Sequence, residues 1–251
     1  MDLGLRGRRA LVTGGTRGIG RSIAETFADE GADVAICARK ADEVGVVVGS
    51  LKAKGVNAFG RAIDVADPAA LKGWVEASAA ALGGIDALVC NVSALAVGDS
   101  PESWERSFRV DMMHTVNAVA AAVPYLEKSP GPAIVVISSV SGFEIDFVAG
   151  SYGAFKGALI HYAKGLSRQL AGKNIRVNCV CPGNTYFEGG IWQSIEQGNP
   201  DLFASTLKVN PTGKVGTPAE VAAGVVFLCS KAAGRVSGAN LTIDGALTAA
   251  V

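Results

Sequence analysis

Charged residues are scarce in this sequence, and neither sign is in excess. They make up 18% of the 251 positions, with 23 Lys and Arg residues offset by 23 Asp and Glu residues. Since about 25% is usual for a soluble domain, this scarcity indicates a large core and some surface buried between subunits. Zero net charge also gives no sign of a nucleic-acid partner or an anionic membrane partner.

Long hydrophobic runs and a leader segment are missing too. No apolar stretch reaches about 18 residues, the length that marks a candidate membrane-spanning helix. The basic residues at positions 6, 8 and 9 are not followed by the apolar run of a signal peptide. We therefore expect a cytoplasmic protein with no membrane partner.

Cysteine and histidine are too few and too scattered to predict a metal site. The five cysteines form an odd set, which argues against a disulfide framework. Cys179 and Cys181 are the only close pair, and their spacing suits one face of a strand better than a zinc knuckle. His114 and His161 are the only histidines, and we interpret both as packing or surface residues.

Short apolar runs alternate regularly with amphipathic stretches. They predict strands at 8–13, 33–38, 57–63, 87–90, 132–138, 175–180 and 240–243. Helices are predicted at 18–29, from after 38 to about 54, and at 68–82, 101–126, 151–171 and 217–229. Asp67 and Ser100 are expected caps, and Thr217 with Glu220 matches a capping box. This alternation predicts an α/β fold with a doubly wound, Rossmann-like parallel sheet, in a single domain over 1–251.

The stretch at about 184–214 differs from the rest because Gly, Pro and aromatic residues occur there with irregular spacing. It follows a predicted strand end, where ligands bind in open parallel sheets. Long excursions of this kind are commonly functional loops. We expect a substrate lid here, in which Trp192 and Phe203 either line a pocket or pack the lid.

A glycine-rich turn at 13–20, Thr-Gly-Gly-Thr-Arg-Gly-Ile-Gly, follows the first predicted strand and opens the first predicted helix. Its spacing is looser than G-x-G-x-x-G, but this strand–turn–helix context is the one that motif requires. Glycines let a diphosphate approach the backbone, and a helix N-terminus favours its negative charge. The turn predicts a dinucleotide site.

Tyr152 and Lys156 lie four residues apart at the start of a predicted helix, and Ser139 ends an apolar run upstream. Residues i and i+4 share one helix face, so the ammonium can lie close to the phenol and favour its ionised form. Such a tyrosine can exchange a proton with a substrate oxygen that Ser139 holds. Together with the glycine-rich turn, these residues predict hydride transfer between a nicotinamide coenzyme and a carbonyl or alcohol.

In these motifs the chain resembles the short-chain dehydrogenases/reductases of roughly 250 residues. The resemblance covers nearly the whole length and rests on the glycine-rich turn, Asp64, Asn91, Ser139, Tyr152 with Lys156, Asn178 with Pro182-Gly183, and Asp244-Gly245. It implies an NAD(P)-dependent oxidoreductase. Relatives are commonly tetramers, so a homotetramer is expected, and the apolar tail at 247–251 fits burial at an interface.

The resemblance also implies a role for each matching position. Tyr152 is the implied acid/base, Ser139 positions the substrate oxygen, and Lys156 holds the nicotinamide ribose. The Asp64-Val65 position is expected to contact the adenine. The other coenzyme-binding positions are Gly14, Thr16, Arg17, Gly18, Ile19, Gly20, Asn91, Pro182 and Gly183.

The end of the second predicted strand bears on the choice of coenzyme. Ala38, Arg39 and Lys40 stand there without the acidic residue that would accept the ribose hydroxyls of NAD. Arg39 and Arg17 can bind a 2′-phosphate through bidentate contacts, unless both are simply solvated. We expect NADP(H), with NAD(H) left open.

Three positions depart from the family pattern. Ser93 replaces a glycine beside the coenzyme, and since serine tolerates positive φ less well, the local turn is expected to differ. Asp111 stands in place of a catalytic asparagine whose main-chain carbonyl holds a relay water; that role can survive, but a carboxylate near Lys156 alters the charge balance. Phe187 replaces a threonine that contacts the carboxamide, so Thr185 substitutes for it or the contact is lost.

The leading hypothesis is an NADP(H)-dependent oxidoreductase of a small carbonyl or alcohol, such as a ketone, quinone, sugar or steroid. A coenzyme-binding sensor or scaffold with weak or lost catalysis is the alternative, supported by Asp111 and Ser93. A sugar epimerase or dehydratase would need a larger C-terminal domain. A ketoacyl-carrier reductase would need more basic residues at the pocket mouth than Lys208 and Lys214.

Overall fold

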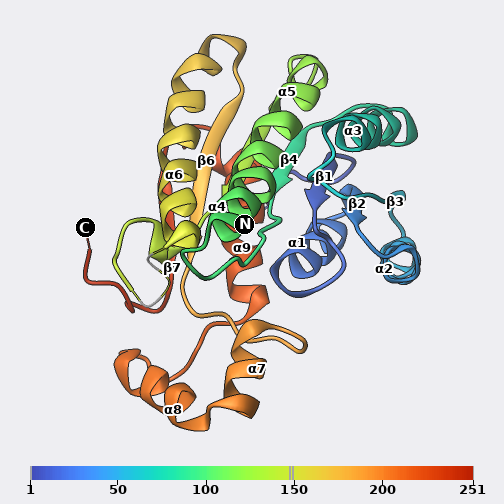
Figure 1. The fold of residues 1–251 in the computed structure, drawn as a ribbon. Coiled ribbons are helices and arrows are strands. Elements are labelled where there is room, and N and C mark those ends of the chain that lie inside the picture. The colour runs from blue at the N-terminus through green and yellow to red at the C-terminus, as the bar shows by residue number, and fades with distance from the viewer. Residues whose placement is uncertain (1, 147, 149, 251) are drawn as a thin grey trace.

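Seven parallel strands form one twisted sheet at the centre of the molecule (Figure 1). The computed structural model describes residues 2–146, 148 and 150–250, so Met1 and Val251, at the ends of the predicted domain, lie outside the described residues. Strand order is β3-β2-β1-β4-β5-β6-β7. The strands are β1 (Arg9–Thr13), β2 (Asp33–Ala38), β3 (Ala58–Ala62), β4 (Ala87–Cys90), β5 (Ala133–Ile137), β6 (Arg176–Pro182) and β7 (Asn240–Ile243).

Helices cover both faces of this sheet, which confirms the predicted doubly wound α/β fold (Figure 1). One face carries α1 (Gly18–Asp29), α2 (Ala41–Ala53) and α9 (Pro218–Cys229). The other carries α3 (Pro68–Leu82), α5 (His114–Leu126) and α6 (Ser151–Gln169). None of the helices in the described part of the chain is long and apolar enough to cross a membrane.

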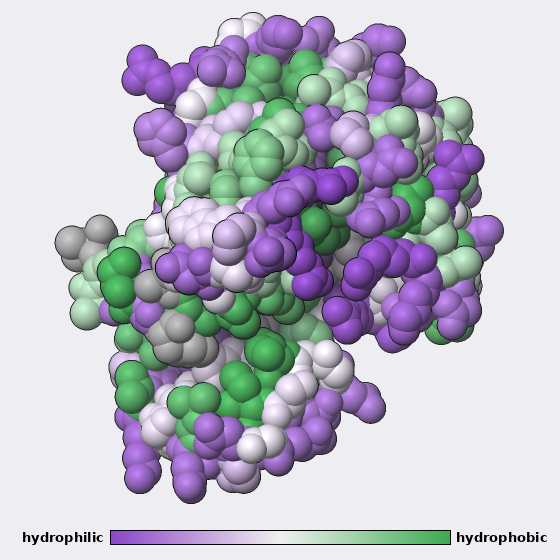
Figure 2. Space-filling view, viewed as in Figure 1, coloured by the Kyte–Doolittle hydropathy of each residue, from purple (hydrophilic) through white to green (hydrophobic). Residues whose placement is uncertain are grey.

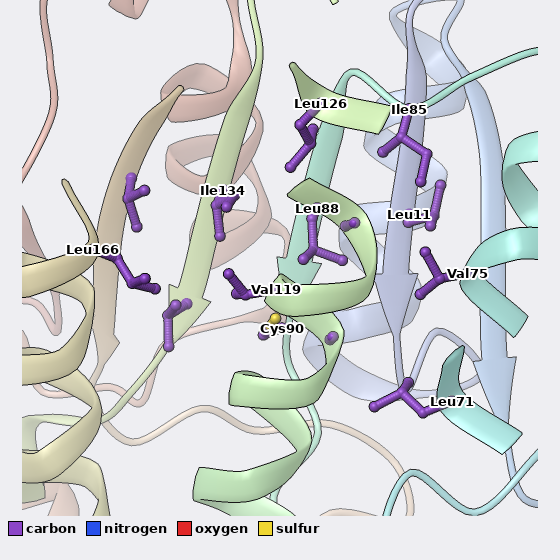
Figure 3. Packing of buried hydrophobic residues seen from close by; sticks show 14 of the residues in the cluster. Leu11, Leu71, Val75, Ile85, Leu88, Cys90, Val119, Leu126, Ile134 and Leu166 are labelled. Atoms are coloured by element: carbon purple, nitrogen blue, oxygen red, sulfur yellow. The ribbon is translucent and has the colours of Figure 1, made fainter. Parts of the chain in front are cut away.

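The core consists of two layers because successive strand side chains point to opposite faces. Leu11, Leu88 and Ile134 pack under α3, α5 and α6, as Figure 3 shows. Their neighbours Val12, Val89 and Val135 pack in the layer on the opposite face. Burying each such side chain contributes about 1.5–3 kcal/mol.

Helix ends follow the expected capping chemistry. The Asp67 carboxylate accepts hydrogen bonds from the backbone N–H groups of Ala69 and Ala70 at 2.9 and 3.1 Å. Thr217 and Glu220 form a complete capping box, with Glu220 accepting from the Thr217 N–H at 2.7 Å. These caps fix the residues at which α3 and α9 begin.

The predicted helix at 101–126 is interrupted in the structure. It begins as α4 (Pro101–Ser107), widens into a π-helical turn, η1 (Phe108–Met113), and resumes as α5. The wider turn carries Asp111. Single π turns within α-helices are frequent at functional sites, and no local sequence pattern marks this one.

The segment expected to be an irregular lid contains two helices, α7 (Ile191–Gly198) and α8 (Pro200–Val209). It projects from the sheet beyond the end of β6 and returns to α9 (Figure 1). Hydrophobic residues gather on the side of this region that faces the rest of the molecule (Figure 2). Its function as a substrate lid stays a prediction.

Candidate active site

A cleft of about 1070 Å³ runs along the carboxyl ends of the strands. It crosses the boundary between the neighbouring strands β1 and β4, where the order of successive strands in the sheet reverses and ligands of open α/β sheets bind. The structure brings most of the predicted site residues together there: Gly14, Thr16, Arg17, Ile19, Gly20, Arg39, Asp64, Val65, Asn91, Ser139, Tyr152, Lys156, Pro182, Gly183 and Thr185. Of the predicted set, Gly18 and Asp111 do not line it.

The glycine-rich turn leaves bare backbone facing the cleft. Gly14 has a φ of +69°, a conformation that favours glycine. A Cβ on Gly20 would lie 2.2 Å from the Gly14 carbonyl oxygen, so no side chain fits there. Helix α1 begins at Gly18. The Gly14 and Gly15 N–H groups donate to the Cys37 carbonyl at 2.9 and 3.2 Å, so the N–H groups that suit a diphosphate are those at the start of α1.

Gly18 is covered by the ring of Phe187. A Cβ on Gly18 would lie 2.6 Å from the Phe187 Cζ atom. The aromatic residue at the position of the family's threonine therefore packs on the glycine-rich turn. Thr185 lies within the cleft, but its hydroxyl donates to the Gly183 carbonyl at 3.0 Å.

A buried network joins β1 to β4 beneath the cleft. The Asn91 N–H donates to the Thr13 hydroxyl oxygen at 2.9 Å, and the Asn91 side-chain amide donates to the Thr13 carbonyl at 3.0 Å. His114 lies 3.0 Å from both the Thr13 hydroxyl and the Val110 carbonyl. Burial lowers the pKa of His114 to about 4. The imidazole is therefore neutral, donates to Val110 and accepts from Thr13.

Cations gather at the end of β2. Arg17, Arg39 and Lys40 all line the cleft. Lys40 is paired with Glu43 at 2.8 Å, and the second Glu43 oxygen accepts from the Thr16 hydroxyl at 3.2 Å. Within the described chain, Arg17 and Arg39 have no acidic partner, so both guanidinium groups can meet an anionic ligand.

The expected adenine position and the Pro182-Gly183 turn also line the cleft. Asp64 and Val65 follow β3, and the Asp64 carboxylate accepts from the Ala66 N–H at 2.9 Å. Pro182 ends β6, and the Gly183 N–H donates to the Ile243 carbonyl at 3.0 Å. The predicted contacts of these residues with a coenzyme remain predictions.

Lys156 and Tyr152 lie together on α6. The Lys156 Nζ is 5.5 Å from the centroid of the Tyr152 ring. Lys156 is only 2% exposed and donates to the Ile137 carbonyl at 3.2 Å. The Ser138 hydroxyl donates to the Lys156 carbonyl at 2.7 Å, which fixes this helix against the end of β5.

Asp111 lies behind Lys156 and pairs with it. The Asp111 Oδ1 is 3.3 Å from Lys156 Nζ, and Asp111 is 1% exposed. Its other oxygen accepts from the Ala94 N–H at 3.0 Å. Burial opposes the charge on Lys156, but Asp111 and Tyr152 outweigh it and raise the pKa of Lys156. The change from asparagine therefore places a carboxylate directly on the lysine.

Ser139 caps a short turn, Val140–Gly142, at the end of β5. Its Oγ accepts from the Ser141 N–H at 3.2 Å and lies 3.2 Å from the Ser141 hydroxyl oxygen. The Ser141 hydroxyl donates to Asp146 at 2.6 Å. Nothing in the sequence singled out Ser141 or Asp146, because their link to Ser139 depends on how the loop folds.

The Ser93 substitution is accommodated without the backbone conformation that glycine favours. Positive φ falls instead on Leu95, at +47°, while Ser93 is not among the residues with positive φ. The Ser93 hydroxyl oxygen accepts from the Leu95 N–H at 3.2 Å. Ser93 thus avoids the positive φ that serine tolerates poorly.

The cysteines and histidines form no metal centre in the described part of the chain. All five cysteines are free and buried. Cys179 and Cys181 share one core layer, as the strand alternation predicted. His161 is exposed, whereas His114 is buried.

Comparisons with known proteins agree with this architecture. The family model described as enoyl-(acyl carrier protein) reductase matches residues 14–248. The isoepoxydon dehydrogenase of Penicillium expansum is 40% identical over 251 residues, covering 98% of this chain and 97% of the relative.

Solved structures match over nearly the whole chain. L-Sorbose reductase from Gluconobacter frateurii, in complex with NADPH and L-sorbose, superposes with a TM-score of 0.90 at 30% identity over 100% of both chains. A short-chain dehydrogenase from Burkholderia cenocepacia, in complex with NADP, gives a TM-score of 0.89 at 33% identity over 97% of this chain and 98% of its own. This chain belongs to the short-chain dehydrogenase/reductase family and is an NAD(P)-dependent oxidoreductase.

Proposed function

We propose that the protein is an NADP(H)-dependent oxidoreductase that interconverts a small carbonyl compound and its alcohol, with Tyr152 as the acid/base. One observation carries the proposal: Ser139, Tyr152 and Lys156 line the same cleft as the bare glycine-rich turn. A sensor or scaffold that binds coenzyme without turnover is the alternative. It has no need for a buried, charged lysine beside a tyrosine.

The residues of the cleft fit NADP(H). The glycines let a diphosphate approach the backbone N–H groups at the start of α1, and Arg17 and Arg39 line the same cleft as cations for a 2′-phosphate. The Gluconobacter frateurii and Burkholderia cenocepacia proteins were solved with NADPH and NADP. When bound, the coenzyme would supply or accept the hydride at the carbon of the substrate.

The protein's own residues would handle the substrate oxygen. In the reducing direction, Ser139 holds the carbonyl oxygen by hydrogen bonding, and the Tyr152 hydroxyl donates its proton to that oxygen as the hydride reaches the carbon. The alcohol is complete once one hydride and one proton have been added. In the oxidising direction Tyr152 takes the same proton back. The ammonium of Lys156 stabilises the phenolate that remains.

Asp111 is proposed to act as a positioning residue for this lysine. A buried ammonium without an anionic partner tends to lose its proton. With Asp111 at 3.3 Å, Lys156 keeps its charge at neutral pH. The main-chain carbonyl of Asp111 accepts from the Thr115 hydroxyl at 2.9 Å and keeps a second lone pair, so a relay through that carbonyl is compatible with this side-chain role.

A homotetramer is proposed for the assembly. Trp104 and Phe108 are 39% and 46% exposed, and both rings pack against Phe155, with ring centroids 5.9 and 6.0 Å apart. An aromatic surface across α4, η1 and α6 is suited to burial against a second copy of the chain. A cytoplasmic location stays a prediction.

The proposal is tested by following NADPH consumption by absorbance over a panel of ketones, aldehydes, quinones and acyl thioesters. Turnover of at least one substrate that is lost in Tyr152→Phe supports the oxidoreductase. Tight NADPH binding without any turnover would favour the sensor. Equal turnover by Tyr152→Phe would remove Tyr152 from its assigned role.

A further inference from the structure

A second cavity, of about 230 Å³, adjoins the catalytic cleft. Residues that are adjacent in the sequence line the two spaces. Ser139 lines the cleft, and the next residue, Val140, lines the cavity. Likewise, Asn184 lines the cavity, whereas Gly183 and Thr185 on either side of it line the cleft. The helix α8 contributes Ser205, Thr206 and Val209. A substrate whose reacting oxygen rests on Ser139 would therefore extend toward this cavity.

Hydrogen-bond acceptors outnumber donors among the described side chains that line the cavity, where the Asn184 amide supplies the N–H donors. Ser205 and Thr206 both donate their hydroxyl protons to the Leu202 carbonyl, at 2.8 and 3.0 Å, which leaves their oxygens as acceptors. Asp146 and Glu144 add two carboxylates. Among the described residues that line the cavity there is no lysine or arginine. An anionic group is thus disfavoured, and a group that donates hydrogen bonds is favoured.

One carboxylate oxygen of Glu144 lacks a partner among the described residues. Its Oε2 atom is buried and has no hydrogen-bond partner in the described chain. Asp146, by contrast, is satisfied: its oxygens accept from the Ser141 hydroxyl at 2.6 Å and the Val148 N–H at 2.9 Å. Burying a carboxylate oxygen without a donor is unfavourable, so such an atom indicates a donor supplied from outside the chain.

Asp146 connects this cavity to catalysis. Because the Ser141 hydroxyl gives its proton to Asp146, its oxygen accepts from Ser139 over 3.2 Å. To hold a substrate carbonyl, Ser139 would turn this proton from Ser141 to the substrate oxygen, so the residue that keeps Ser141 an acceptor also lines the cavity. A substrate group bound there lies beside the loop that positions the reacting oxygen.

We propose that this cavity binds a hydroxyl group of a neutral, polyhydroxylated carbonyl substrate, with the Glu144 carboxylate as the acceptor. The inference rests on the proposed oxidoreductase function and names its substrate class. A hydroxyl that donates to a carboxylate forms a charge-assisted hydrogen bond. An analogue that lacks this hydroxyl leaves the carboxylate unpaired and is rejected.

The test compares cyclohexanone with 2-, 3- and 4-hydroxycyclohexanone as substrates with NADPH. We expect the kcat/KM of at least one hydroxyketone to exceed that of cyclohexanone by about tenfold or more, the usual effect of one charge-assisted hydrogen bond. This preference should fall about tenfold in Glu144→Gln. It should persist in Glu188→Gln, which changes an exposed carboxylate in the loop between β6 and α7. A preference unchanged by Glu144→Gln, or no preference at all, overturns the proposal.

A binding measurement separates this proposal from the oxidoreductase function. The melting temperature of the coenzyme-saturated Tyr152→Phe protein is measured with each ketone, so no turnover is needed. A hydroxyketone should stabilise the protein more than cyclohexanone does, and the difference should disappear when Glu144→Gln is added. Absence of any such difference overturns the hydroxyl site, whereas only the turnover comparison with Tyr152→Phe bears on the oxidoreductase function.

Discussion

The carboxylate of Asp111 lies 3.3 Å from the ammonium of Lys156, and both groups are almost fully buried. Lys156 lines the catalytic cleft from the first turns of α6, and Asp111 lies behind it on a π-helical turn. Removing one partner of a buried ion pair leaves an uncompensated charge and commonly costs about 3–5 kcal/mol. The pair is therefore both a structural element and a means of keeping Lys156 charged.

Replacing Asp111 should change how activity depends on pH. Asp111 raises the pKa of Lys156 against the opposing effect of burial, so Asp111→Asn should lower it and move the alkaline limb of kcat/KM to lower pH. The raised pKa of Lys156 also makes the stability of the protein depend on pH. A raised folded-state pKa gives stabilisation that is complete below the unfolded pKa of about 10.4 and is lost as pH rises through the higher folded value.

The control for Asp111→Asn is Glu76→Gln, which removes an exposed carboxylate 3.8 Å from Lys72 on α3. Its pH profile should match that of the unaltered protein. If the alkaline limb of Asp111→Asn does not move, Asp111 does not hold the charge of Lys156.

Arg39 should determine the preference for NADPH. Loss of one charge-assisted contact with the 2′-phosphate should weaken NADPH binding about tenfold or more in Arg39→Ala. Binding of NADH, which lacks this phosphate, should stay within about twofold. Fluorescence titration with both coenzymes gives the two dissociation constants, and Arg235→Ala, at an exposed arginine outside the cleft, is the control. NADPH affinity unchanged by Arg39→Ala would falsify the assignment.

Gly20→Ala should abolish coenzyme binding. The added Cβ would meet the Gly14 carbonyl at 2.2 Å, so the glycine-rich turn has to move. Gly49→Ala, in α2, meets nothing within 4 Å and should leave binding intact while stabilising the protein by about 0.4–1 kcal/mol. Calorimetric titration of both variants with NADPH checks this. Normal NADPH affinity in Gly20→Ala would place the diphosphate elsewhere.

His114 should make the protein less stable in acid. Burial lowers the pKa of His114 to about 4, against about 6.5 in the unfolded chain. The unfolded state thus binds the proton first, and about 3 kcal/mol of stability should be lost as pH falls from 6.5 to 4. This contribution should be absent from His114→Gln and retained in His161→Gln, which alters the exposed histidine. Urea unfolding at pH 7 and pH 4.5 measures it, and equal pH dependence in all three proteins would contradict it.

Much of the fold could be predicted from periodicity and capping. Strand alternation, the Asp67 cap and the Thr217 capping box depend on neighbours in the sequence, and all three are present in the structure. The coenzyme and catalytic residues could be predicted to lie in one site because their motifs follow predicted strands. Parallel strands bring their carboxyl ends to the same edge of the sheet.

The remaining features depend on contacts between residues distant in the sequence. The π turn at Asp111, its direct pairing with Lys156 and the Phe187 ring on Gly18 each require side-chain directions that no local pattern encodes. The Glu144 oxygen without a partner is a further case, because the lack of a hydrogen-bond donor beside it depends on how the loop folds.

The most direct test of the central claim is a label-transfer measurement. NADPH carrying deuterium at both C4 positions of the nicotinamide is incubated with the protein and its best ketone substrate, and the alcohol is examined by mass spectrometry. We predict one deuterium on the carbinol carbon, with formation of this alcohol lost in Tyr152→Phe. An alcohol without deuterium, or the same yield from Tyr152→Phe, would contradict hydride transfer with Tyr152 as the acid/base.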